Sequence, residues 1–386
     1  MLIRIAQLNS LVSYRFYTAV TEEIRTLIST CTTDNIFINI FICCLHFNLL
    51  TFVERFAEFS NFGESMKPRV YLTRPDVAQV GIDLIQDECE LTTWFDESPV
   101  PREELLRNVA GKDALFCTLT DKIDAEVLDQ AGPNLKVVAT MSVGYEHIDI
   151  TECKKRGIRV GYTPDCLTDA TAELTIALLL ATTRRLIEAN EEVHTGGWSS
   201  WSPGWMCGQS IKNSTVGIVG FGRIGQEVAK RIVPFRPKRL LFSNRSERPE
   251  EAKQIGAEQC TFDELLHNSD FVILTCAATP DTFHLINAAS LGKMKTNAVL
   301  INTSRGTLVN QTDLYDFLKT ERIRAAGLDV TTPEPLPLDS PLLTLQNCIV
   351  LPHIGSADVD TRKEMSRITA CNILAGLKGV KMIAEL

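Results

Sequence analysis

Short apolar runs separated by amphipathic stretches recur along the chain from Lys67 onward. Uninterrupted apolar runs of this kind are typical of strands buried on both faces of a parallel sheet. One group predicts strands at 69–73, 115–118, 135–140 and 158–161, with a helix over 77–86. A second group predicts strands at 216–219, 239–243, 271–276, 298–302, 323–328 and 348–351. Alternation of strands with helical segments predicts an α/β fold with two doubly wound parallel-sheet domains.

One helical segment lies between these two units in the sequence, and another follows the second unit. Residues 168–195 read as one long helix that is apolar nearly all round at first, so we expect it to be buried between domains or between subunits. From Gly355 the chain reads as a final helix, which we expect to pack back on the first unit. We therefore predict an extension at 1–65, a first domain at 66–167 with 354–386, and a second domain at 168–353.

A glycine-rich turn follows the strand at 216–219. Gly220, Gly222 and Gly225 stand in the order G-x-G-x-x-G, and Arg223 and Ile224 begin a helical stretch at once. In a dinucleotide site the first glycine permits a sharp turn, the second lets the backbone approach a pyrophosphate, and the third lets helix and strand pack closely. The helix N-terminus offers unpaired N–H groups to the phosphates. The strand–glycines–helix context predicts a Rossmann dinucleotide site.

The next strand end indicates which dinucleotide binds. NAD enzymes usually place an acid about 20 residues beyond the glycines, on the ribose hydroxyls. This chain has Ser243, Asn244, Arg245 and Ser246 there, with no acid before Glu247. A guanidinium can bind a phosphate through two parallel hydrogen bonds, whereas an acid would repel it. We therefore predict NADP(H), which carries a 2′-phosphate, as the cofactor. The alternative is a solvated turn with incidental arginines.

Three ionisable side chains follow three successive predicted strands: Arg305, Glu334 and His353. Parallel strands of one sheet end on one edge, so we expect these side chains to converge beside the cofactor. Arginine can bind a carboxylate in a fork, histidine can donate a proton near neutral pH, and a neighbouring carboxylate favours the charged imidazole. The set predicts hydride transfer to a 2-keto acid.

Two further segments bear on the substrate. Ser142, Val143 and Gly144 follow a strand of the first unit, where backbone N–H groups can hold a carboxylate, unless the turn only links strand to helix. The loop at 196–205 holds three of the four tryptophans, either for packing or to close over a neighbouring site.

Residues 1–65 differ from the rest in having no proline and no lysine. The stretch 36–53 carries no formally charged side chain, but its length is near the minimum for a membrane span and Asn39, His46 and Asn48 weaken that interpretation. Three interpretations stay open: a membrane anchor, a mitochondrial targeting leader, or a dispensable extension. We expect a cytoplasmic protein, or a mitochondrial one if the leader is real.

Composition excludes some classes of function. Hydrophobic residues make up 45% and charged residues 23%, as in ordinary globular proteins, and the net charge of −9 without a long basic run argues against nucleic-acid binding. The 12 cysteines are scattered without C-x-x-C pairs or Cys/His clusters. This spacing predicts free thiols and no metal site.

A resemblance to a known family rests on four segments in order: Gly220–Gly225, Asn302–Gly306, Gly327–Val330 with Glu334-Pro335, and Pro352–Ser356. The chain resembles the D-isomer-specific 2-hydroxyacid dehydrogenases over residues 67–386, and most closely their glyoxylate and hydroxypyruvate reductase branch. The resemblance implies a flavodoxin-like substrate domain and NADPH-driven reduction of hydroxypyruvate to D-glycerate and of glyoxylate to glycolate. It implies that Arg305 and the Val143–Gly144 turn bind the substrate carboxylate, that Glu334 tunes His353 as general acid, and that Asp329 contacts the nicotinamide carboxamide. It also implies a homodimer in which Trp201 enters the partner's site.

Two alternatives stay open. A dehydrogenase for another small D-2-hydroxy acid would carry the same motifs. So would a dinucleotide-sensing scaffold, like the transcriptional corepressors that share this fold.

Overall fold

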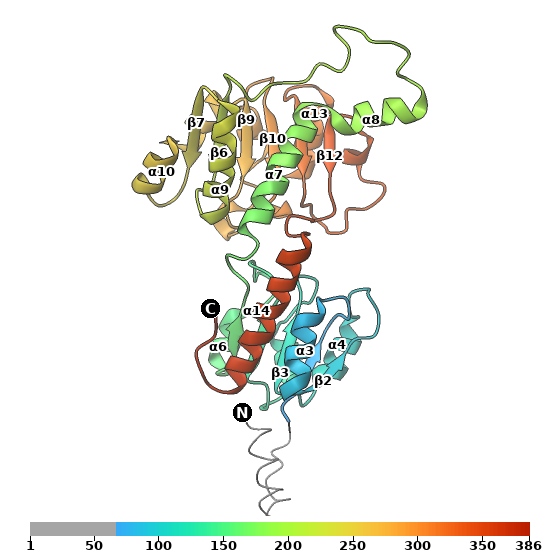
Figure 1. Cartoon of the computed structure of the whole chain (residues 1–386), viewed down its shortest axis with the longest axis vertical. Helices are drawn as coiled ribbons and strands as arrows, with labels where there is room; N and C mark the ends of the chain where they lie inside the picture. The colour runs from blue at the N-terminus through green and yellow to red at the C-terminus, as the bar shows by residue number, and fades with distance from the viewer. Residues whose placement is uncertain (1–66) are drawn as a thin grey trace, which may run out of the picture. The chain divides into compact units, whose positions relative to one another are not determined.

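The computed structural model describes residues 67–386, which form two parallel sheets with helices on their faces (Figure 1). Our expectations about residues 1–65, including the apolar stretch 36–53, lie outside the described residues. Within 67–386 no helix is long and apolar enough to cross a membrane.

The smaller sheet has five parallel strands in the order β2-β1-β3-β4-β5, which is the flavodoxin-like order. All four strands predicted for this unit are present. The edge strand β2 was missed because its sequence, Glu-Leu-Thr-Thr, has no apolar run and none of its residues is fully buried. Its elements are β1 (Arg69–Leu72), α3 (Gln79–Glu88), β2 (Glu90–Thr93), α4 (Arg102–Val109), β3 (Ala114–Cys117), α5 (Ala125–Ala131), β4 (Val137–Thr140), α6 (Ile150–Lys155) and β5 (Arg159–Gly161).

The larger sheet has seven parallel strands in the order β12-β11-β10-β9-β6-β7-β8. The middle strand is β9, and the direction of the strand order reverses between β6 and β9, as in a Rossmann sheet. The six predicted strands are present, and β8 was missed because its two residues are both exposed. The strands are β6 (Thr215–Val219), β7 (Arg239–Ser243), β8 (Glu258–Gln259), β9 (Phe271–Leu274), β10 (Val299–Asn302), β11 (Ala325–Leu328) and β12 (Cys348–Val350).

Helices cover both faces of this sheet, and each face has its own apolar cluster. Strands β6, β9 and β10 are buried throughout, so their side chains fill both clusters. The covering segments are α9 (Arg223–Ile232), η1 (Val233–Phe235), α10 (Pro249–Ile255), α11 (Phe262–Asn268), η2 (Pro280–Thr282), α12 (Ala288–Leu291), η3 (Gly306–Leu308), α13 (Gln311–Lys319) and η4 (Pro341–Thr344).

The helix predicted over 168–195 is two helices, so that prediction is wrong in its length. Helix α7 (Thr168–Thr183) ends where Arg185 takes a left-handed backbone conformation (φ 55°), and α8 (Leu186–Thr195) begins. The apolar surface of α7 is buried against α9, β10 and β11 of the larger sheet, whereas α8 buries no residue. The break therefore separates a core helix from an exposed one.

The last helix, α14 (Val359–Leu377), packs on α3, β4 and β3 of the smaller sheet (Figure 1). Its Asn372 side chain donates to the carbonyl of Tyr162 at 3.0 Å, and Arg159 pairs with Glu385 at 2.6 Å beyond the helix. The chain thus returns to the smaller sheet after completing the larger one.

Candidate active site

The three glycines after β6 have different surroundings. Gly220 has φ +93°, and a Cβ there would lie 2.6 Å from the backbone of Cys276, while a Cβ on Gly225 would overlap the carbonyl oxygen of Gly220. A Cβ on Gly222 would meet no atom within 4 Å. The first and third glycines are therefore required by packing, whereas the second leaves open space where a ligand can approach.

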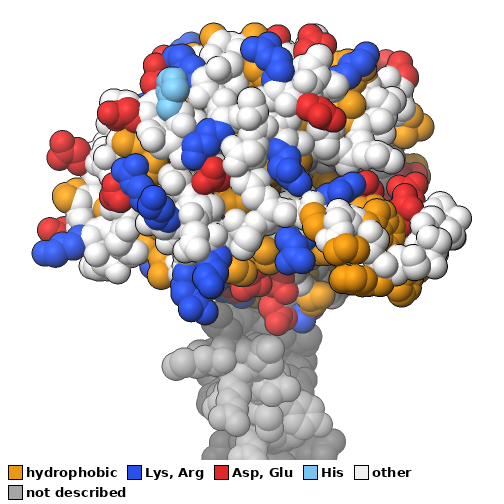
Figure 2. All heavy atoms as spheres, turned by 90° about the horizontal axis from the view of Figure 1, so that it is seen from above, with side chains coloured by type: hydrophobic (Ala, Val, Ile, Leu, Met, Phe, Trp, Pro, Cys, Tyr) orange, Lys and Arg blue, Asp and Glu red, His pale blue; other side chains and the backbone are white. Residues whose placement is uncertain are grey.

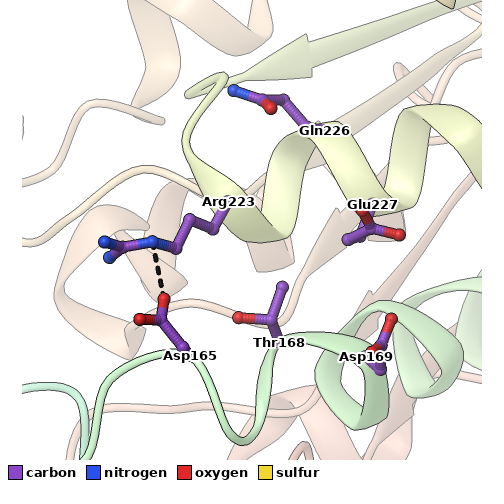
Figure 3. Close-up of a pocket in the computed structure, with 6 residues that line it drawn as sticks. All are labelled: Asp165, Thr168, Asp169, Arg223, Gln226 and Glu227. Atoms are coloured by element: carbon purple, nitrogen blue, oxygen red, sulfur yellow. Dashed lines mark ion pairs between the residues drawn. The ribbon is translucent and has the colours of Figure 1, made fainter.

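The N-terminus of α9 has no side-chain cap, since Gly222 occupies the N-cap position. Its first N–H groups are therefore available to an anion. The guanidinium of Arg223 turns to Asp165 and pairs with it at 2.6 Å (Figure 3). The two line an open pocket of about 460 Å³ together with Thr168, Asp169, Gln226 and Glu227. Ile224 is partly buried against apolar clusters of both sheets.

The turn after β7 is held by Asn244. Its side-chain oxygen accepts from the Phe221 N–H at 3.1 Å, and its amide nitrogen donates to the carbonyl of Ser246 at 2.8 Å. Ser243 ends the strand, and its carbonyl accepts from the Gly220 N–H at 2.8 Å. Arg245 is exposed and forms no ion pair with any residue of 67–386. The turn therefore presents a free cation beside the glycine loop.

Glu334 and His353 come from neighbouring strand ends, after β11 and β12. The Glu334 carboxylate approaches Nδ1 of His353 at 2.9 Å and accepts from the Thr331 N–H at 2.9 Å through its other oxygen. Burial raises the pKa of Glu334, but the hydrogen bonds from His353 and Thr331 lower it more, so its pKa lies below the usual range. The carboxylate is thus ionised when it faces the imidazole.

Arg305 follows β10, the strand beside β11. A Cβ on the next residue, Gly306, would overlap the backbone of Thr331, so the two loops touch. The Thr331 N–H in turn holds Glu334. The structure therefore brings Arg305, Glu334 and His353 to one edge of the larger sheet.

Asp329 is 1% exposed and fixes the backbone around His353. Its two carboxylate oxygens accept from the N–H groups of Ile354 and Gly355, both at 2.8 Å, and its carbonyl accepts from the His353 N–H. Burial raises the pKa of Asp329, and the two N–H groups oppose this rise only in part. Asp329 thus holds the turn that presents the imidazole.

The Ser142–Gly144 turn of the smaller sheet reaches Arg305. A Cβ on Gly144 would overlap the guanidinium, so the turn and the arginine are in direct contact. The same guanidinium lies 3.5 Å from Glu146, and it donates to the carbonyl of Ser304 at 2.8 Å. Glu146 and His147 lie two and three residues beyond Gly144. Sequence analysis missed them because only their contacts, with Arg305 for Glu146 and with Thr140 for His147, show their place.

Trp201 is not brought to these residues within the described chain, and its side chain is 82% exposed. Five other large apolar side chains of the same segment are also exposed: Leu186, Ile187, Val193, Trp198 and Trp205. Figure 2 shows hydrophobic side chains gathered on the side where Figure 1 draws α8.

Residues 176–355 match the family model of the D-isomer specific 2-hydroxyacid dehydrogenase NAD binding domain. The glyoxylate reductase/hydroxypyruvate reductase of Mus musculus is 53% identical over 326 residues, which is 83% of this chain and 99% of the relative. The chain belongs to the D-isomer-specific 2-hydroxyacid dehydrogenases. The Homo sapiens relative of the same name is 53% identical over 319 residues, covering 82% of this chain and 97% of the relative.

Solved structures of similar proteins agree with this dehydrogenase fold. A protein from Thermus thermophilus superposes with a TM-score of 0.77 at 40% identity, covering 82% of this chain and 99% of its own. An NADPH-dependent glyoxylate/hydroxypyruvate reductase from Sinorhizobium meliloti, in complex with NADP and malonate, has a TM-score of 0.72 at 28% identity and covers 83% of this chain and 97% of its own. As a member of this family, the chain is an oxidoreductase with an NAD(P)-binding domain.

Proposed function

We propose that this dehydrogenase reduces hydroxypyruvate to D-glycerate and glyoxylate to glycolate with NADPH. The observation that carries the proposal is the Glu334–His353 pair, 2.9 Å apart, at the same sheet edge as Arg305. The names of the Mus musculus and Homo sapiens relatives support these substrates, because both are called glyoxylate reductase/hydroxypyruvate reductase.

The side chains divide the work as follows. Arg305 binds the substrate carboxylate and polarises the ketone oxygen, and the N–H groups of Val143 and Gly144 add donors beside the guanidinium. When bound, NADPH supplies the hydride that reduces the carbonyl carbon. His353 gives a proton to the carbonyl oxygen through Nε2, which makes no hydrogen bond to any residue of 67–386. Glu334 stabilises the imidazolium that gives this proton.

The preference for NADPH is supported at the end of β7. No acid precedes Glu247 in the turn, and Arg245 is exposed without an ion pair among the described residues. An acid there would repel a 2′-phosphate, whereas a free guanidinium attracts it. The solved Sinorhizobium meliloti relative is also called NADPH-dependent.

We also propose that the protein is a homodimer in which Trp201 reaches the partner's site. The exposed apolar side chains of residues 186–205 support this, since contiguous apolar patches usually mark interaction surfaces. Sedimentation velocity should give a dimer, and Trp201→Ala should raise KM for the keto acid. A monomeric full-length protein with full activity would overturn this proposal.

The test of the activity is an NADPH oxidation assay with the full-length chain, hydroxypyruvate, glyoxylate and a panel of other 2-keto acids. His353→Ala should lower kcat by about 100-fold or more while the melting temperature stays close to wild type. A normal rate in this variant removes His353 from the mechanism. NADPH binding without turnover of any keto acid would favour the scaffold alternative, and turnover of a different keto acid would redefine the substrate.

A further inference from the structure

A chain of hydrogen bonds runs from His147 to the turn that contacts Arg305. The Nε2 atom of His147 lies 3.0 Å from Oγ1 of Thr140, and that oxygen lies 2.8 Å from Oγ of Ser142. Ser142 Oγ then donates to the carbonyl of Gly144 at 2.6 Å. None of the roles proposed above uses His147 or Thr140.

The direction of every bond in this chain follows from its last member. A carbonyl oxygen can only accept, so the Ser142 hydroxyl gives its single hydrogen to Gly144. Ser142 must then accept the hydrogen of Thr140, and Thr140 must accept from His147. His147 is therefore protonated on Nε2 for as long as the chain is intact.

Burial protects the chain from water. Thr140 is 0% exposed and Ser142 is 2% exposed. Burial also lowers the pKa of His147 to about 4, with the charge of Arg305 acting in the same direction and Glu146 opposing it. At neutral pH the ring is neutral, and a neutral imidazole has one N–H to give.

The last bond of the chain controls the shape of the turn. It joins the Ser142 side chain to the carbonyl two residues on, so Val143 lies inside a closed ring. Such a ring restricts rotation of the two peptides whose N–H groups face the substrate carboxylate in the proposed function. Gly144 stands against the Arg305 guanidinium, where a small rotation of the turn would displace these donors.

We propose that His147 is a positioning residue, which donates from Nε2 through Thr140 and Ser142 to hold the Val143–Gly144 turn in the shape that binds the substrate carboxylate. This inference rests on the proposed function, because only there does the Val143–Gly144 turn bind the substrate carboxylate.

The first test is ¹⁵N NMR of full-length protein labelled at histidine, with the His147 signal assigned by its loss in His147→Gln. The expected signature is a protonated Nε2 and an unprotonated Nδ1 at neutral pH. A ring protonated at Nδ1 alone would overturn the proposal, whatever the enzyme's substrate proves to be.

The second test compares matched pairs by steady-state kinetics and by the dissociation constant of oxamate, an unreactive keto-acid analogue. Thr140→Val and His147→Met remove the hydrogen bond and should raise KM and the oxamate constant about tenfold, with a smaller effect on kcat. Thr140→Ser and His147→Gln keep a group that can replace the lost bond, so they should recover most of the affinity. Unchanged KM in both disrupted variants, or equal loss in both pairs, would overturn the proposal.

The two proposals fail in different ways. If wild type does not reduce hydroxypyruvate or glyoxylate, the proposed function is wrong, and the NMR signature still tests the hydrogen-bond chain. If wild type is active and the disrupted variants bind oxamate normally, only the role of His147 is wrong.

Discussion

The carboxylate of Glu334 lies 2.9 Å from Nδ1 of His353, and the Thr331 N–H occupies its other oxygen at 2.9 Å. An ionised carboxylate with these two partners can only accept, so Nδ1 of His353 carries a hydrogen. The second ring nitrogen, Nε2, makes no hydrogen bond to any residue of 67–386. The pair therefore fixes the orientation and the tautomer of the imidazole.

Glu334→Gln should therefore lower kcat about 10- to 100-fold, the value of a hydrogen bond to a charged group. Thr331 and His353 contact different oxygens of the carboxylate, and an amide places an NH2 group, which only donates, at one of these two positions. The matched control is Gln311→Ala, because Gln311 bonds the neighbouring Thr332 backbone but does not touch the imidazole. Steady-state kinetics of both variants would check this, and a Glu334→Gln enzyme as fast as the control would contradict it.

Alanine at Gly222 should weaken cofactor binding without affecting stability, whereas alanine at Gly225 should lower stability. Gly222→Ala fits the backbone (φ −76°, ψ −164°) and meets no atom within 4 Å, so the melting temperature should hardly change while the NADPH dissociation constant rises about tenfold. Gly225→Ala would place its Cβ against the Gly220 carbonyl and 2.8 Å from Oγ1 of Thr275, which should cost about 1–3 kcal/mol of stability. Thermal unfolding and NADPH titration would check the pair. Normal NADPH binding by Gly222→Ala would mean that the ligand does not approach this glycine.

Arg245→Asp should change the preferred cofactor. Replacing the exposed guanidinium by a carboxylate should raise KM for NADPH about 10- to 100-fold and lower KM for NADH, because the acid repels a 2′-phosphate and accepts from ribose hydroxyls. Arg248→Ala is the control, since Arg248 already lies 3.5 Å from Glu251. Unchanged KM values for both cofactors in Arg245→Asp would defeat the phosphate-binding role.

We predict that Glu146 competes with the substrate carboxylate for Arg305. Its carboxylate lies 3.5 Å from the guanidinium and is 46% exposed, so the ion pair is weak and easily exchanged. Glu146→Gln should lower KM for the keto acid about two- to fivefold, the range of an exposed ion pair. The gain should shrink as salt is added, because salt screens the competing charge. A higher KM in the variant would instead make Glu146 part of the binding site.

The sequence predicted every strand with an apolar run, including the edge strands β5 and β12, and missed the two polar edge strands. Strand β10 is buried on both faces, so its side chains must be apolar almost throughout, and this pattern is visible in the sequence. Strands β2 and β8 lie at sheet edges with exposed residues, so nothing requires apolar side chains there. The break at Arg185 was not predicted either, because neither glycine nor proline marks it.

The residues of the candidate site also fall into those that a sequence pattern predicted and those that it missed. Arg305, Glu334 and His353 were found because each follows a strand of one parallel sheet, and the topology then brings them to one edge. Glu146 and His147 were missed because their place depends on contacts that no periodicity encodes. Glu146 meets an arginine from the other sheet, and His147 acts through two hydroxyl groups.

His147 should also leave a signature in the pH dependence of stability. Burial lowers the pKa of His147 from 6.5 to about 4. Between these pH values the imidazole is protonated in the unfolded chain and neutral in the folded chain. Stability must then rise with pH across this window, and be lost as pH falls from about 6.5 toward 4. At pH 5 the loss of stability should be of the order of 2 kcal/mol, because one pKa unit corresponds to about 1.4 kcal/mol.

The glutamine of His147→Gln does not titrate, so the melting temperature of this variant should fall less than that of wild type between pH 7 and pH 5. Glu334 and the other carboxylates titrate in both proteins, and their contribution cancels in the difference. Parallel melting profiles would show that His147 is not held neutral by the fold.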